Sequence, residues 1–122
     1  MVKNTDINIL TNKLEKINFL KIEKNKNLAE FASFKVGGPA DLFLTPKNTA
    51  AVKKLMPLIF KSEIPYFILG KGSNLIISDK GYRGIIIYTG ELNEYSLEKN
   101  ILKAQSGLEL KEIADIALEN SL

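Results

Sequence analysis

The residues whose types and spacing best suit ligand binding form a glycine turn between two apolar runs. Gly70 and Gly72 carry no Cβ atom, so the backbone there can adopt positive φ angles and approach a ligand closely. The N–H groups of such a turn can converge on an anion, and Ser73 and Asn74 add a hydroxyl and an amide that can donate to phosphate oxygens. The pattern predicts a phosphate-binding turn, although spacing alone fits a glycine hairpin that binds nothing equally well.

The turn differs from the dinucleotide-binding turn of Rossmann folds. That fingerprint requires a third glycine and a helix that begins directly after the turn. Here a short apolar run rich in β-branched residues follows at residues 75–77, which is typical of a strand. The predicted element is therefore strand, glycine turn, strand, in which turn amides hold a phosphate without a helix dipole.

Composition excludes several other chemistries. The 122 residues, one domain's length, include no cysteine and no histidine. This removes disulfides, thiol catalysis, cysteine metal sites and the commonest acid/base at neutral pH, and we expect no metal site. The net charge is +3, the lysines are scattered and Arg83 is the only arginine. The chain therefore lacks the clustered basic stripe of nucleic-acid-binding proteins.

Neither a membrane span nor a secretion signal is expected. No apolar run reaches the roughly 18 residues that a span requires, and the first residues lack the apolar core of a signal peptide. We therefore expect a cytoplasmic protein without a membrane partner.

Hydrophobic periodicity predicts the elements that must position the turn. A helix over residues 5–18 is expected, capped by Thr5 or Asp6, and then a polar, solvated connection over residues 21–27. A second helix is expected to begin at Asn48 or Thr49 and to end near Ser62. Inside it, Pro57 predicts a kink or a division into two short helices. A third helix at residues 109–120 follows a capping box at residues 106–109.

The strands are predicted from short apolar or alternating runs. They are expected at residues 34–36, at 42–44 where Pro46 ends the run, at 66–69, and at 84–88, which is apolar on both faces and therefore a central strand. Residues 92–97 and 100–105 predict a hairpin.

Three blocks of sequence, in order, resemble one family closely. They are residues 33–41 (Ser-Phe-Lys-Val-Gly-Gly-Pro-Ala-Asp), 69–75 (Leu-Gly-Lys-Gly-Ser-Asn-Leu) and 78–84 (Ser-Asp-Lys-Gly-Tyr-Arg-Gly). The chain resembles the UDP-N-acetylenolpyruvoylglucosamine reductases (MurB). These are FAD-dependent oxidoreductases of peptidoglycan synthesis, and hence of bacterial cell wall biogenesis, cell shape and cell division.

The resemblance covers residues 28–122 and implies an α+β, FAD-binding fold of the PCMH/VAO type. Only the N-terminal portion of that fold is expected, a small βαββ subdomain and the start of the second subdomain. Residues 1–27 form a separate segment of amphipathic helix and connection. We expect residues 28–122 to be a truncated FAD-binding domain, with a C-terminal half that this sequence does not contain.

The resemblance also implies which residues hold the FAD diphosphate. The family's pyrophosphate loop falls on Gly70, Lys71, Gly72, Ser73 and Asn74, flanked by Leu69 and Leu75, with Lys71 as a solvated charge near the phosphates. Outside this loop, Gly107 matches a family glycine near the cofactor. Gly37 and Gly38 are expected to serve a backbone turn, and turn-stabilising roles are expected for Asp79, Tyr82 and Arg83.

The resemblance implies a reaction whose catalytic residues this sequence does not contain. In the family, NADPH reduces FAD, and hydride then passes to UDP-N-acetylglucosamine enolpyruvate, the UDP-sugar substrate. The family's second glycine-rich loop and its catalytic arginine, serine and glutamate have no counterpart in this sequence. We therefore expect no catalytic residue here, and a fragment inactive by itself.

Three alternatives stay open at this stage. The chain could be a stand-alone module that binds FAD or another nucleotide. It could be an inert truncated remnant, whose exposed sheet edges would make it prone to aggregate. It could also belong to another flavin oxidase of the same superfamily.

Overall fold

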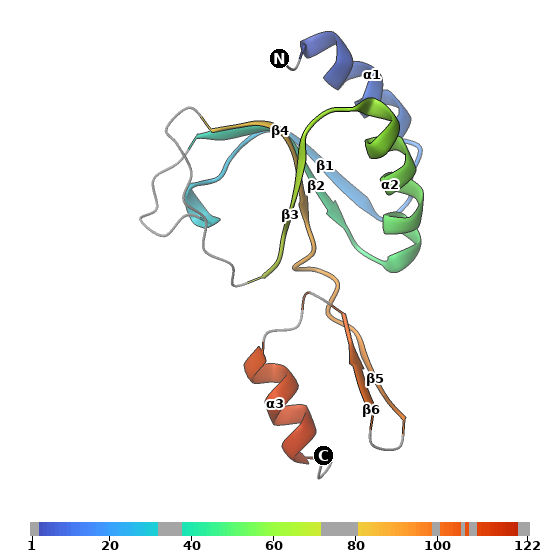
Figure 1. Ribbon diagram of the computed structural model, residues 1–122, viewed down its shortest axis with the longest axis vertical. Coiled ribbons are helices and arrows are strands. Elements are labelled where there is room, and N and C mark those ends of the chain that lie inside the picture. The colour runs from blue at the N-terminus through green and yellow to red at the C-terminus, as the bar shows by residue number, and fades with distance from the viewer. Residues whose placement is uncertain are drawn as a thin grey trace.

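A four-stranded sheet with two helices on one face forms the larger part of the structure (Figure 1). The computed structural model describes residues 3–31, 38–71, 81–98, 101–105, 107 and 110–119. Its elements, in chain order, are α1 (Asn4–Leu14), β1 (Leu20–Asn27), a 3₁₀ turn η1 (Ala29–Phe31), β2 (Pro39–Pro46), α2 (Thr49–Ser62), β3 (Tyr66–Leu69), β4 (Tyr82–Tyr88), β5 (Tyr95–Glu98), β6 (Ile101–Ala104) and α3 (Leu110–Glu119).

The sheet has the strand order β1-β2-β4-β3. β1 pairs antiparallel with β2, whereas β2, β4 and β3 run parallel to one another. The predicted central strand is confirmed, because β4 lies between β2 and β3 and its residues Ile85, Ile86 and Ile87 are at most 2% exposed. Parallel strands are typically buried on both faces in this way.

Both α1 and α2 cover the same face of the sheet, and α2 confirms its prediction closely. Asn48 is the N-cap of α2, and its side-chain oxygen accepts a hydrogen bond from the Ala51 N–H at 2.9 Å. Pro57 lies inside one continuous helix, so a division into two helices is wrong. Leu55 and Ile59, on either side of Pro57, are buried against the sheet, and this tertiary packing offsets the backbone hydrogen bond that proline removes.

The first helix is confirmed, but its ends differ from the prediction. α1 ends at Leu14 rather than near residue 18, and its N-cap is Lys3, without a side-chain hydrogen bond, rather than Thr5 or Asp6. Ile7, Leu10 and Leu14 supply its buried face. Burial of this apolar face, rather than the identity of the capping residue, therefore fixes the position of the helix.

The predicted solvated connection at residues 21–27 is wrong, because these residues belong to β1. β1 pairs with β2 from Leu20 opposite Pro46 to Asn27 opposite Pro39. Its apolar side chains Leu20 and Ile22 pack against the core, while all the others are charged or polar. An edge strand is held through its backbone hydrogen bonds, so polar side chains did not reveal it. The proposed division of the chain at residue 28 stays a prediction.

The hairpin and the last helix are confirmed, with shorter strands than predicted. β5 and β6 pair antiparallel, with Tyr95 opposite Ala104 and Glu98 opposite Ile101. Together with α3 they lie beyond the carboxyl ends of β3 and β4, in the lower part of Figure 1. Predictions for residues 34–36, for residues 75–77 and for the capping residues Ser106 and Glu109 fall outside the described residues. Among the described helices, none combines the length and the apolarity needed to cross a bilayer.

Candidate functional site

The carboxyl ends of three parallel strands meet along one edge of the sheet. β2 ends at Pro46, β3 at Leu69 and β4 at Tyr88, and the three run in the same direction. In open sheets of this kind, ligands bind in the crevice outside the carboxyl ends of the strands. The glycine turn begins at this edge, since it follows β3 directly.

The end of β3 is held firmly by the central strand. The carbonyl oxygen of Leu69 accepts two hydrogen bonds from Thr89, one from the backbone N–H at 2.9 Å and one from the hydroxyl at 3.3 Å. Both residues are buried. The first residue of the predicted loop is thereby fixed to β4. Sequence reasoning missed Thr89, whose only signal is a hydroxyl that follows the apolar run at the end of β4.

Three of the seven predicted cofactor-binding residues lie within the described part of the chain. Leu69 is buried, Gly70 is half-buried and Lys71 is exposed at the carboxyl edge. The other four lie outside the described residues: Gly72, Ser73, Asn74 and Leu75.

The Lys71 ammonium lies close to the first turn of α3. Its Nζ atom is 3.7 Å from Oε1 of Glu112, and the two side chains are 42% and 44% exposed. The amino end of a helix carries a partial positive charge that favours anions. Sequence reasoning expected no helix dipole at this turn, since no helix follows it in the chain. The structure shows that the Glu112 side chain, from the first turn of α3, reaches Lys71, while the expectation of a turn without a helix dipole stays a prediction.

Polar contacts near this edge also join the hairpin, and the segment before it, to the start of α2. The side-chain amide of Gln105 donates to the Thr49 hydroxyl at 3.1 Å, and its oxygen accepts from the Glu94 N–H at 2.9 Å. The Lys47 ammonium pairs with the Glu91 carboxylate at 3.0 Å. These contacts connect the start of α2 with the segment that leads from β4 into the hairpin.

Gly107 packs against that same segment. Its N–H donates to the Leu92 carbonyl at 2.6 Å. A Cβ atom at this position would lie 2.6 to 2.7 Å from the carbonyl oxygens of Leu92, Gly90 and Thr89. Backbone atoms cannot move aside cheaply, so glycine is required here for packing. The proximity of Gly107 to a cofactor stays a prediction.

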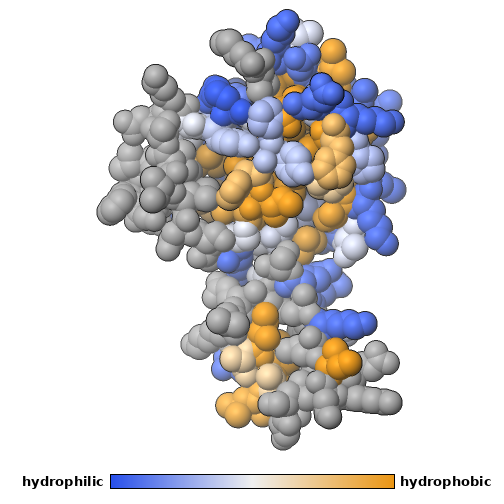
Figure 2. Space-filling model, in the orientation of Figure 1, coloured by the Kyte–Doolittle hydropathy of each residue, from blue (hydrophilic) through white to orange (hydrophobic). Residues whose placement is uncertain are grey.

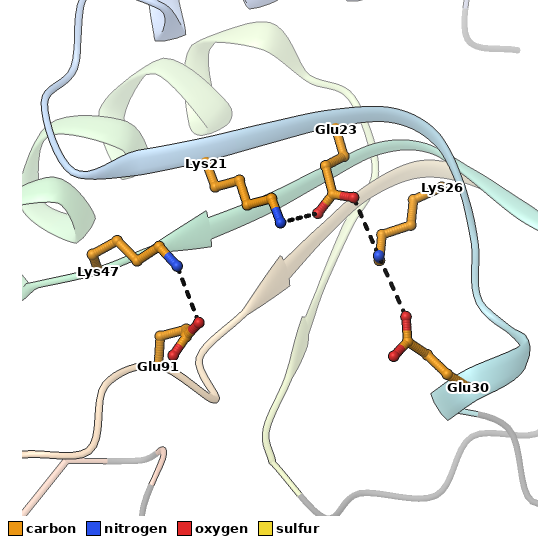
Figure 3. A network of polar contacts seen from close by, with 6 residues as sticks. All are labelled: Lys21, Glu23, Lys26, Glu30, Lys47 and Glu91. Atoms are coloured by element: carbon orange, nitrogen blue, oxygen red, sulfur yellow. Dashed lines mark hydrogen bonds and ion pairs between the residues drawn. The ribbon is translucent and has the colours of Figure 1, made fainter.

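The helix-free face of the sheet carries a shallow recess with a volume of about 180 Å³. Figure 3 shows a chain of ion pairs along its rim. Lys26 lies 3.2 Å from Glu23 and 3.3 Å from Glu30, and Glu23 also pairs with Lys21 at 3.7 Å. An aromatic cluster, in which Phe31 stacks on Phe43 at 5.4 Å, lies beneath. These lysines face carboxylates, so the recess offers little uncompensated charge.

Lys26 has a perturbed pKa because of this network. Partial burial alone would lower the pKa of the ammonium, but the Glu23 and Glu30 carboxylates outweigh burial and raise it. The ammonium also lies 5.3 Å from the centre of the Phe43 ring, a distance that allows a favourable cation–π contact.

Arg83 contacts two residues at the start of β2, whereas its expected role in stabilising a turn stays a prediction. Its guanidinium lies 3.1 Å from the Asp41 carboxylate and donates to the Pro39 carbonyl at 3.0 Å, which ties β4 to the start of β2. Burial raises the pKa of the neighbouring Tyr82 phenol. Asp79 and Gly37 lie outside the described residues.

The described residues at the carboxyl edge fit an anionic group. They provide the Lys71 ammonium and the backbone of Gly70, whereas the Glu112 carboxylate beside Lys71 opposes an anion. The sheet fixes the start of the turn through Thr89. Within the described part of the chain, no group of three or more histidine, cysteine, aspartate or glutamate side chains could hold a metal ion.

Comparisons with known proteins agree with this chemistry. The family described as FAD binding domain matches residues 40–122. Proteins named UDP-N-acetylenolpyruvoylglucosamine reductase match the whole chain in Clostridium novyi (42% identical, 39% of that protein covered) and in Clostridium kluyveri (41% identical, 40% covered). In Clostridium perfringens strain 13 the match is 43% identical over 95 residues. The resemblance inferred from the three sequence blocks is confirmed, and the chain spans about two fifths of the curated relatives that it matches from end to end.

A solved structure supports the fold. The chain superposes on p-cresol methylhydroxylase with bound substrate with a TM-score of 0.65, at 14% identity, covering 99% of this chain and 26% of that one. The predicted α+β fold of the PCMH type, present in part, is confirmed.

Proposed function

Because the chain belongs to the FAD binding domain family, we propose that it is the FAD-binding part of a reductase acting on UDP-N-acetylglucosamine enolpyruvate in peptidoglycan precursor synthesis. The observation that carries this proposal is that the whole chain matches part of proteins named UDP-N-acetylenolpyruvoylglucosamine reductase, at 42% identity in one case. The three sequence blocks, in order, favour this family over the other flavin oxidases of the same fold.

The proposed binding mode uses the carboxyl edge of the sheet. The backbone of Gly70 and the Lys71 ammonium would face the FAD diphosphate, together with Gly72, Ser73 and Asn74 of the same turn. The bond from Thr89 to Leu69 holds the start of this turn in place. When bound, FAD supplies the hydride chemistry, while the protein binds and orients it.

The proposed reaction needs groups beyond this chain. NADPH is the proposed reductant and the enolpyruvyl UDP-sugar the proposed substrate, in the cytoplasm. The sequence contains neither histidine nor cysteine, and no residue of it is proposed as the proton donor to the product. We therefore expect no NADPH oxidation and no reduction of the UDP-sugar by the purified chain alone.

The test is an equilibrium titration of the purified chain with FAD, followed by flavin fluorescence up to millimolar concentrations. We expect weak binding that gel filtration does not preserve, and its loss in Gly72→Val, because the added side chain blocks close approach of the backbone. Ala50→Val, which places the same valine side chain at an exposed position of α2, is the control and should bind as the wild type does. Equal affinity in Gly72→Val, or no binding at all, would refute the proposal.

A stand-alone module is the alternative that the same experiment distinguishes. A yellow cofactor that stays bound through gel filtration would favour it over a part of a larger reductase. NADPH oxidation by this polypeptide, free of contaminating reductase, would overturn the expectation of inactivity.

A further inference from the structure

Among the described strands, β3 lies at an edge of the sheet, and its own four residues include none of the features that usually protect such an edge. Of these strands, β3 pairs only with β4. Natural edge strands are usually protected by lysine, proline, bulges or a covering segment. The sequence of β3 is Tyr-Phe-Ile-Leu, with no charge and no proline. An edge of this kind is a template for pairing with another strand.

The backbone of β3 alternates between its two sides. The carbonyl oxygens of Pro65 and Leu69 accept hydrogen bonds from Ile85 and Thr89, on the β4 side. Because successive backbone groups of a strand point to opposite edges, the groups of Tyr66 and Ile68 point to the open side. They offer donors and acceptors to an added strand.

Apolar side chains gather around this open edge. Phe67 and Ile68 are 46% and 54% exposed, and Tyr66 is 37% exposed. Phe60 of α2 is 60% exposed and contacts the Tyr66 ring edge-on, at 5.8 Å between centroids. We call these four residues the β3 patch. Figure 2 shows hydrophobic side chains, in orange, on the surface over β3 and beside α2. Because side chains alternate along a strand, Tyr66 and Ile68 face the side of α2 and Phe67 faces the opposite side, so the β3 patch lies around the open edge. Exposed apolar surface marks interaction sites.

We propose that the β3 patch binds a polypeptide segment that adds a strand beside β3, and that this segment belongs to the part of the reductase that this chain does not match. This inference rests on the proposed function. Its support is the length of the relatives, since the whole chain corresponds to only 39% of the Clostridium novyi reductase. Strand addition would supply backbone hydrogen bonds, and the patch would supply apolar contacts.

A second copy of this chain is the competing occupant. Each copy carries a net charge of +3, so two copies repel weakly, whereas a different segment need not carry that charge. β3 also leads directly into the glycine turn. Covering β3 would therefore support the strand from which the proposed cofactor loop begins.

The test is co-expression of this chain, tagged, with the part of the Clostridium novyi reductase that it does not match, in the absence of added FAD. We expect the two polypeptides to co-purify, and the amides of residues 66–69 to exchange hydrogen more slowly in the complex. Ile68→Lys should lower recovery of the complex about tenfold, as expected for a residue at the centre of an interface. Phe60→Ser, which leaves the strand itself unchanged, should lower it as well.

The matched control is Ile9→Lys. Ile9 is 51% exposed on α1, close to the 54% of Ile68, and its substitution should leave recovery unchanged. Absence of a complex, or equal recovery with Ile68→Lys, would overturn the inference. A dimer of this chain with protected β3 amides would assign the patch to a second copy instead. Co-purification does not depend on FAD, so a chain that fails to bind FAD but still forms the complex would refute the cofactor proposal alone.

Discussion

Lys71 and Glu112 form an ion pair, with 3.7 Å between Nζ and Oε1, that connects the glycine turn after β3 to the first turn of α3. The two residues lie far apart in the sequence, and their side chains are partly exposed. The pair places a carboxylate beside the cation that we propose to face the FAD diphosphate. The two charges should therefore have opposite effects on an anionic ligand.

Substitution of each partner should change FAD affinity in opposite directions. Lys71→Gln removes a cation and should weaken binding by about two- to fivefold, whereas Glu112→Gln removes a repelling carboxylate and should strengthen it by a similar factor, since exposed pairs contribute up to about 1 kcal/mol. Flavin fluorescence titrations at low and high salt measure both, and salt should reduce both effects. Asp115→Asn, exposed on the same helix, is the control. If Lys71→Gln and Glu112→Gln change the FAD affinity in the same direction, this binding mode is contradicted.

The hydrogen bond between Gln105 and Thr49 should couple the hairpin to α2. Gln105→Ala and Thr49→Ala each remove it, so the two changes should not add in the free energy of unfolding. We expect a coupling energy of about 0.5–1 kcal/mol in a double-mutant cycle measured by urea denaturation. A parallel cycle of Gln105→Ala with Ser96→Ala, an exposed residue of β5, should be additive. Equal coupling in both cycles would show that the hydrogen bond is not the cause.

Gly107→Ala should destabilise the protein even without a cofactor. The new methyl group would lie within 2.7 Å of three carbonyl oxygens of the segment after β4, and overpacking of this kind costs about 1–3 kcal/mol. Thermal and urea unfolding of the FAD-free protein measure the loss. If stability is unchanged and only FAD affinity falls, the glycine serves the cofactor rather than the packing.

Stability should fall as the pH rises above the normal pKa of tyrosine. Burial raises the pKa of Tyr82 above 10.0 in the folded state, so the folded protein holds this proton more tightly than the unfolded chain does. The stabilisation is complete below pH 10 and is lost as the pH rises through the folded pKa. The raised pKa of Lys26 acts in the same direction. Tyr82→Phe should therefore reduce the alkaline slope of the unfolding free energy, measured by urea denaturation across this pH range, without abolishing it, because Lys26 still contributes.

Much of the fold could be predicted from hydrophobic periodicity. α2, β4, the hairpin and α3 each carry an apolar pattern that matches the period of the element, and β4 is buried on both faces. β1 could not be predicted, because an edge strand is held by its backbone and its charged side chains are satisfied by ion pairs such as Lys26 with Glu23. The continuous course of α2 through Pro57 depends on burial against the sheet, which the local sequence does not reveal.

The candidate site was predictable only in its local part. The glycine turn is visible because its residue types and spacing are contiguous in the sequence. Thr89 and Gln105 act on residues 20 and 56 positions away, and Glu112 reaches Lys71 from another element. Their roles depend on the arrangement of the strands and helices, so a single sequence without that arrangement gives no signal for them.

The two hydrogen bonds from Thr89 to the Leu69 carbonyl oxygen have a thermodynamic consequence. Thr89 is buried and directly follows β4, the strand that carries Ile85, Ile86 and Ile87, so detaching the start of the turn would break its hydrogen bonds to the end of this central strand. An anion held at the turn would then protect the entire sheet against melting, by an amount that grows with ligand concentration. Binding of an anion at the turn should therefore raise the midpoint temperature of thermal unfolding, even when the anion binds too weakly to stay bound during chromatography.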